Sequence, residues 1–184
     1  IWTGVLLGAT VALWTAAVVR REHSRAAVAP ALGVVMALFA SSPNLLAAAA
    51  LATTDLVATA TYFAAVGCWW FYWQRPGRWR LLAAGALLGL ALAAKLTGVL
   101  IVPLLLPLAY VYGYRGRRDW PRPGLMWLAA LAIGGLTLWA VYAFQLRPFP
   151  LAAYRESWTN VLNHVSTGHQ AFFLGEISDG GWWL

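Results

Sequence analysis

Three charged residues lie within or beside long apolar stretches of the sequence, away from its arginine-rich loops: Asp55, Lys95 and Arg147. An ionisable group at membrane depth costs about 2.5–3.5 kcal/mol on insertion scales, so each is a candidate for function. A carboxylate such as Asp55 can accept a proton from a hydroxyl group or hold a divalent cation. A cation such as Lys95 can stabilise negative charge that develops during a reaction.

Further titratable side chains follow in the last segment, where the composition becomes polar. They are Arg155, Glu156, His164, His169, Glu176 and Asp179. A carboxylate near a cation and two histidines could bind a phosphate-bearing ligand, a divalent metal ion, or both, and the candidate metal ligands are Asp55, His164 and His169. The spacing leaves these alternatives open, because His164 and His169 lie five residues apart, whereas side chains four apart stack on one helix face.

The composition indicates that lipid is the solvent for most of the chain. Of 184 residues, 61% are apolar and 10% are charged, whereas a soluble domain carries roughly 25% charged residues. Twelve tryptophans agree with this, because amphipathic rings favour membrane–water interfaces. We therefore predict an all-α polytopic membrane protein that binds no nucleic acid despite its net charge of +7. The lone Cys68 excludes an internal disulfide and a multi-cysteine metal site.

Apolar runs separated by short basic loops predict about six membrane-spanning helices. The predicted spans are 1–19, 26–40, 55–73, 80–95, 98–114 and 123–146. The stretch from Leu45 to Ala52, which Pro43 introduces, is too short to cross and predicts an interfacial helix or a re-entrant elbow. The predicted organisation is a transmembrane helical bundle over 1–146 and an extracytoplasmic loop, cut short, over 147–184.

The basic residues predict the orientation of these spans. Six crossings place ten of the thirteen Lys and Arg residues on one side. These ten are Arg20, Arg21, Arg25, Arg75, Arg78, Arg80, Arg115, Arg117, Arg118 and Arg122. By the positive-inside rule that side is cytoplasmic, in a multi-pass protein of the inner membrane. Asp55, Lys95 and the 147–184 segment then meet on the extracytoplasmic side, and this convergence favours a functional site there.

Each candidate also has a purely structural interpretation. Asp55 could cap the third span by accepting hydrogen bonds from free amides of its first turn. Lys95 could extend its ammonium group to the outer lipid headgroups, and Arg147 could anchor the end of a span. Either histidine could be a solvated loop residue.

Three segments carry a resemblance. They are Ser42-Pro43-Asn44-Leu45-Leu46 with Leu51-Ala52-Thr53-Thr54-Asp55-Leu56; Leu88-Gly89-Leu90-Ala91-Leu92-Ala93-Ala94-Lys95-Leu96-Thr97; and Gly168-His169-Gln170-Ala171-Phe172-Phe173-Leu174-Gly175-Glu176 with Gly181-Trp182-Trp183. Each resembles a segment of the bacterial membrane glycosyltransferases of family 39. This group is related to protein O-mannosyltransferases and to the lipid A aminoarabinose transferase. The segments come in family order and cover most of residues 40–184.

The resemblance implies a bundle of the GT-C type that works as an enzyme. Such enzymes transfer a hexose or pentose from a polyprenyl-phosphate carrier to a protein, lipid or glycan acceptor on the outer face of the membrane. Asp55 matches the family's second acidic residue, near the donor phosphate or an associated divalent metal ion. Lys95 matches a basic position that faces the site. His164 or His169, with Glu176, would bind the substrate from the loop that covers the donor.

Two departures from the family pattern bear on activity. Ala47 to Ala50 are all alanine where members often carry a histidine, and the family's main acidic motif belongs before the first span of this chain. We therefore expect an excerpt of a longer enzyme that is inactive alone. Alternatives are half of a membrane transporter or lipid flippase, and a non-catalytic membrane assembly subunit. The Gly4–Gly8 and Gly85–Gly89 pairs have the spacing of closely packed helices.

Overall fold

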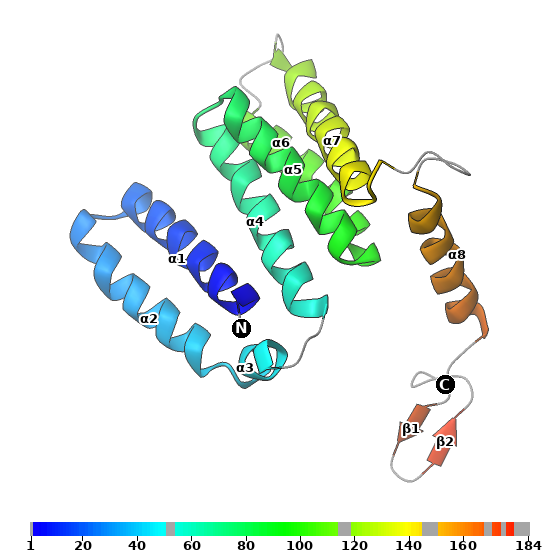
Figure 1. The fold of residues 1–184 in the computed structure, drawn as a ribbon. Coiled ribbons are helices and arrows are strands. Elements are labelled where there is room, and N and C mark those ends of the chain that lie inside the picture. Colours follow the sequence, from blue (N-terminus) through cyan, green and yellow to red (C-terminus); the bar gives the residue numbers. More distant parts are fainter. Residues whose placement is uncertain are drawn as a thin grey trace. The chain divides into compact units, whose positions relative to one another are not determined.

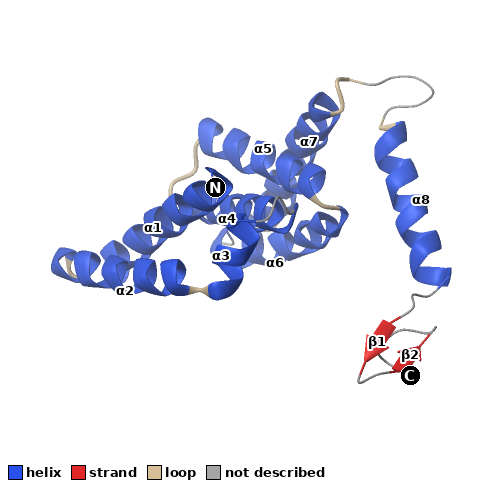
Figure 2. Cartoon of the chain, turned by 60° about the horizontal axis from the view of Figure 1, so that its bottom comes forward, coloured by secondary structure: helices blue, strands red, loops and turns tan. Residues whose placement is uncertain are grey.

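The computed structural model describes residues 2–50, 54–113, 119–144, 151–167, 171–173 and 176–178, with the backbone alone for residues 49, 164–167, 171–173 and 176–178. They belong to two compact units, Ile1–Val141 and Tyr142–Leu184. The first unit contains α1 (Trp2–Glu22), η1 (Arg25–Ala27), α2 (Val28–Ser41), α3 (Pro43–Ala50), α4 (Thr54–Gln74), α5 (Arg78–Ala94), η2 (Leu96–Leu100), α6 (Ile101–Gly113) and α7 (Pro121–Val141). The second contains α8 (Ala152–Thr167) and an antiparallel pair of short strands, β1 (Ala171–Phe173) and β2 (Glu176–Ser178), as Figures 1 and 2 show. The all-helical prediction is therefore confirmed for the described residues of the first unit, and the strand pair is an addition to it.

A helix of the first unit corresponds to each of the predicted apolar segments. Pro43 opens α3 as predicted, and the long apolar stretch after Arg80 does divide at Lys95, between α5 and η2. The last helix of the first unit, α7, ends at Val141 rather than near residue 146 as predicted. The reason is local, because Ala143 and Phe144 adopt φ angles of 54° and 53°, a left-handed conformation that terminates helices.

Within the described residues, three stretches are long and apolar enough to cross a membrane: α1, the continuous Leu96–Gly113 stretch of η2 and α6, and α7. The Arg25–Ser41 stretch is apolar but shorter. Large apolar side chains are exposed to the surroundings, among them Leu6 on α1, Leu38 on α2 and Val111 on α6. Exposed apolar surface of this extent is typical of a lipid-facing protein. The membrane class is supported, whereas six crossings and their orientation stay predictions.

The core of the first unit lies around α5, which packs most extensively against α4 and α7 (Figure 1). A methyl group built on Gly85 would lie 2.6 Å from Cβ of Ile133, and one built on Gly89 would lie 2.4 Å from the carbonyl oxygen of Gly134. Only glycine allows the two helix backbones to approach this closely. The packing role predicted for Gly85 and Gly89 is confirmed, and this approach positions the end of α5.

Two tryptophans tie α6 to its neighbours through hydrogen bonds to its backbone. The indole N–H of Trp69, on α4, donates to the carbonyl oxygen of Leu105 at 2.9 Å. The indole N–H of Trp127, on α7, donates to the carbonyl oxygen of Val102, also at 2.9 Å. Trp69 is almost completely buried, with its ring stacked on that of Tyr72. Indole N–H groups on α4 and α7 thus hold the apolar helix α6 in place, because lipid offers these groups no other hydrogen-bond partner.

We expect Trp69→Phe to destabilise the protein by about 1–2 kcal/mol, because it removes both a buried hydrogen bond and part of a buried ring. Thermal unfolding in a mild detergent measures the effect. Trp2→Phe is the matched control, since Trp2 is 82% exposed, and it is expected to leave the unfolding midpoint unchanged. Equal midpoints for the two variants would contradict the role assigned to Trp69.

Candidate functional site

Asp55 and Lys95 form an ion pair that joins two helices. Asp55 lies in the first turn of α4, and Lys95 lies between the end of α5 and the start of η2. Consecutive helices run in opposite directions (Figure 1), so the start of α4 and the end of α5 are at the same end of the unit. The Nζ atom of Lys95 lies 2.5 Å from Oδ1 of Asp55. The structure therefore brings into contact the two charged residues that the sequence predicted to lie at the same end of the helical bundle.

Two residues that the sequence analysis did not single out complete this polar cluster. The hydroxyl group of Tyr62 lies 3.1 Å from Oγ1 of Thr97 and donates to the carbonyl oxygen of Lys95 at 3.5 Å. The same carbonyl accepts the backbone N–H of Gly98 at 2.9 Å. Tyr62 follows Asp55 by seven residues, a spacing that puts both on one face of α4 and was the available signal. The backbone of Lys95 is thus held by its neighbours, which orients its side chain.

The close packing of η2 on α5 fixes this turn. A methyl group on Gly98 would lie 2.6 Å from the carbonyl oxygen of Ala91 in the last turns of α5. Lys95 itself is extended, with φ −157° and ψ 140°, so it leaves the helix and turns back toward α4. Because Gly98 has no side chain, η2 can pack directly against the backbone of the last turns of α5.

The ion pair is open to its surroundings, which is what a ligand site requires. The side chains of Lys95 and Asp55 are 43% and 64% exposed. The hydrogen bond and the negative charge of Asp55 raise the pKa of Lys95 above its ordinary value of 10.5. Lys95 therefore keeps its proton throughout the physiological range and presents a permanent cation beside a carboxylate.

A titration of Lys95 tests this electrostatic coupling directly. Lys95 is the only lysine in the sequence, so ¹³C-methylation of the protein labels this one side chain besides the terminal amine. We expect a higher NMR titration midpoint in the parent than in Asp55→Asn, because the negative charge of Asp55 stabilises the protonated form. Because the folded pKa is raised, the stabilisation by the pair is complete at neutral pH and is lost only as pH rises through that raised pKa. A parent midpoint at or below that of Asp55→Asn would contradict the coupling.

The other predicted site residues belong to the second unit. His164 lies in α8 and Glu176 begins β2, and the described structure gives their backbone only. His169 and Arg147 lie outside the described residues. Their meeting with Asp55 and Lys95 stays a prediction.

A metal site is likewise neither assembled nor contradicted in the described part of the chain. Among the residues whose side chains are described, no three His, Cys, Asp or Glu side chains gather in a group that could hold a metal ion. The predicted ligands His164 and His169 are not among those residues. Asp55 is thus the one proposed metal ligand whose side chain is among the described ones.

Comparisons with protein-family models, with curated proteins and with solved structures find no match to this chain. Function must therefore be inferred from the side chains and distances described above.

Proposed function

We propose that the chain is part of an integral-membrane glycosyltransferase that moves a sugar from a polyprenyl-phosphate carrier to an acceptor on the extracytoplasmic face of the membrane. The observation that carries this proposal is the exposed Asp55–Lys95 ion pair. It lies at the end of the helices away from the arginines at the ends of α1 and α4. By the positive-inside rule, that end faces outward, where a lipid-linked sugar donor is used.

The pair offers the two functions that this transfer requires. An acceptor oxygen attacks the anomeric carbon of the sugar and forms the new glycosidic bond. The bond between that carbon and the phosphate oxygen breaks, and the electron pair leaves with the lipid phosphate. The acceptor proton passes to the carboxylate of Asp55, and the ammonium group of Lys95 stabilises the charge on the departing phosphate.

A divalent metal ion is an alternative task for Asp55, since a carboxylate oxygen suits such an ion and the donor phosphate would supply further oxygens. His164, His169 and Glu176 are proposed to cover the bound donor. The resemblance also implies a main acidic motif that residues 1–184 do not contain. Activity is therefore proposed for a protein that joins this chain to such a motif.

The test uses the longer protein that contains this chain, in membrane vesicles supplied with a panel of radiolabelled polyprenyl-phosphate sugars. The expected result is transfer of label from donor to an acceptor fraction, with release of unlabelled polyprenyl phosphate. Vesicles without the protein and vesicles with heat-unfolded protein are the controls.

Two other outcomes separate this proposal from its alternatives. Movement of intact donor across the bilayer, without cleavage, would favour a flippase. A folded protein that neither cleaves nor moves any donor of the panel would overturn the transferase proposal for those sugars and favour an assembly subunit.

A further inference from the structure

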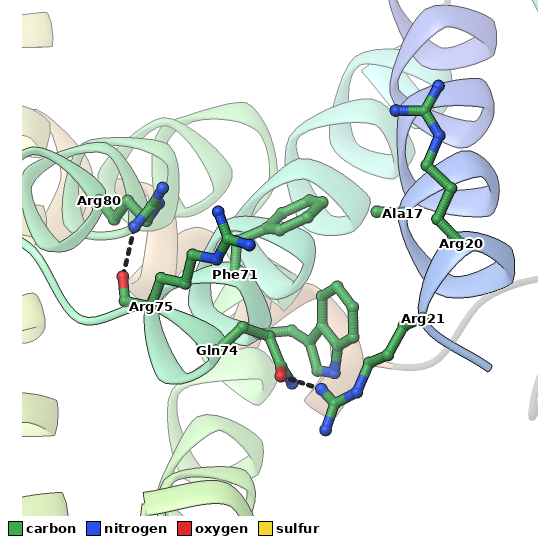
Figure 3. A pocket seen from close by; sticks show the side chains of 8 residues that line it. Ala17, Arg20, Arg21, Phe71, Gln74, Arg75 and Arg80 are labelled. Atoms are coloured by element: carbon green, nitrogen blue, oxygen red, sulfur yellow. Dashed lines mark hydrogen bonds between the residues drawn. The ribbon is translucent and has the colours of Figure 1, made fainter. Parts of the chain in front are cut away.

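A basic cavity lies at the opposite end of the first unit from the Asp55–Lys95 pair. Its volume is about 470 Å³, and the ends of α1, α4 and α5 line it. Figure 3 shows Arg20 and Arg21 on one wall, from α1, and Phe71 and Gln74 on the other, from α4, with Arg75 directly after α4. Arg80, from α5, completes the set of guanidinium groups. Residues from three helices thus converge on one space that the proposed reaction does not use.

Positive charge in this cavity exceeds the negative charge that the described residues place beside it. Arg21 donates to the side-chain oxygen of Gln74 and lies 3.5 Å from Glu22, and Arg80 donates to the backbone carbonyl oxygen of Arg75 at 2.5 Å. Within the described residues, neither Arg20 nor Arg75 has a carboxylate within ion-pair distance. Four guanidinium groups therefore share one carboxylate, and two of the four are oriented by neutral acceptors.

A second cavity extends the same basic surface. It has a volume of about 540 Å³, and Arg20 and Arg25 line it together with apolar residues of α2. Arg20 borders both cavities, so the basic surface continues across the end of α1. Planar guanidinium groups match phosphate oxygens in a bidentate way, which a lysine cannot do.

A separate apolar groove lies along α1 beside Phe63 of α4. The groove has a volume of about 250 Å³ and is lined by Trp14, Val18, Val19 and Phe63 with Thr15. The rings of Trp14 and Trp70 lie 6.3 Å apart, and Trp70 is itself part of the basic cavity. Trp14 precedes Arg21 by about two helical turns. A basic space of headgroup size and an apolar groove nearer the middle of α1 thus lie close together, and the contact between Trp14 and Trp70 links their linings.

We infer that this end of the protein binds an anionic phospholipid, with its phosphate between Arg20 and Arg75 and an acyl chain in the groove between α1 and α4. A free phosphate ion would use the guanidinium groups but not the apolar groove, and a neutral phospholipid would leave the excess charge unneutralised. The lipid bridges α1 to α4 and α5, and it acts at the end away from the proposed sugar-transfer site. This inference does not depend on the proposed enzymatic function.

The test uses the full chain in phosphatidylcholine nanodiscs, titrated with phosphatidylglycerol or cardiolipin, with native mass spectrometry and the unfolding midpoint as readouts. We expect anionic lipid to bind and to raise the midpoint. The Arg20→Gln/Arg75→Gln variant is expected to bind it roughly tenfold more weakly or worse, since each arginine near a lipid surface contributes on the order of a fivefold gain in affinity. Among the described residues, no ion pair or hydrogen bond involves the side chain of Arg20 or Arg75, so the variant is expected to fold as the parent does.

Controls separate the cavity from general surface charge. Arg78→Gln/Arg122→Gln removes the same charge from the arginine-rich end at two positions outside the cavity, and it is expected to keep the parent affinity. Ala17→Leu fills the cavity without a change of charge and is expected to weaken binding of lipid. Equal losses in the two double variants would overturn the proposal in favour of unspecific attraction. An equal rise of the midpoint with inorganic phosphate would overturn it in favour of a free-anion site.

Discussion

Replacement of Asp55 by asparagine is expected to lower the rate of sugar transfer by about a hundredfold or more, the usual contribution of a positioned general acid or base. Asparagine keeps the size of the side chain but cannot accept the proton of the acceptor. Lys95→Ala is expected to lose activity on a similar scale, because it removes the cation that stabilises the departing phosphate. The measurement is the initial rate of transfer by the longer protein in vesicles.

Unfolding is not expected to explain these losses. Both side chains of the pair are exposed by 43% or more, and an exposed ion pair contributes little to stability. The unfolding midpoints of Asp55→Asn and Lys95→Ala should therefore stay close to that of the parent. Asp119→Asn is the matched control, since it removes a carboxylate just before α7, and its rate should equal the parent rate. Parent-like rates in both site variants would leave Asp55 as a helix cap and Lys95 as an anchor.

A charge-swapped variant distinguishes a catalytic pair from a structural clamp. Asp55→Lys combined with Lys95→Asp can form the same ion pair with its charges exchanged. If the pair only held α4 to α5, the swap would restore activity that each single variant lacks. We expect activity to stay lost, because the base and the cation would then stand on the wrong sides of the reacting bond.

Gly89→Ala is expected to destabilise the protein by about 1–3 kcal/mol, which is typical of overpacking a core. The added methyl group would lie 2.4 Å from the carbonyl oxygen of Gly134 and 2.6 Å from Cβ of Thr137. The nearer of these is backbone, so no change of rotamer relieves the contact and α5 must move away from α7. Thermal unfolding in detergent measures the effect.

The adjacent helix supplies a sharp control for this substitution. Gly135 follows Gly134 on α7, but a methyl group built on it would meet nothing within 4 Å. Gly135→Ala should leave the midpoint unchanged or raise it, because alanine is the better helix former. If Gly89→Ala and Gly135→Ala behaved alike, the close approach of α5 to α7 would be wrong. A shift of α5 would also displace Lys95 from Asp55, so Gly89→Ala is expected to lower activity as well.

Part of the candidate site could be predicted because it depends only on the order of the helices. Asp55 precedes one predicted span and Lys95 follows the next, and chain reversal puts both at one end whatever the packing. Their contact at 2.5 Å and the roles of Tyr62 and Thr97 could not be predicted in this way. They depend on the rotation of α4 and α5 about their own axes and on how η2 returns against α5.

The sequence by itself determined which segments are helical and roughly where most of them begin and end, since apolar runs, prolines and clusters of arginine are local signals. It also indicated a membrane protein, which three long apolar helices support. Only the tertiary structure decided which helices are neighbours, because helices that are apolar on all sides carry no face pattern that points to a core. The packing of α5 on α7 is set by the close approach at Gly85 and Gly89, and the packing of α6 on α4 and α7 by two indole N–H groups. The spacing of the glycines predicted a close approach, but the partner helix is decided by contacts between residues far apart in the chain.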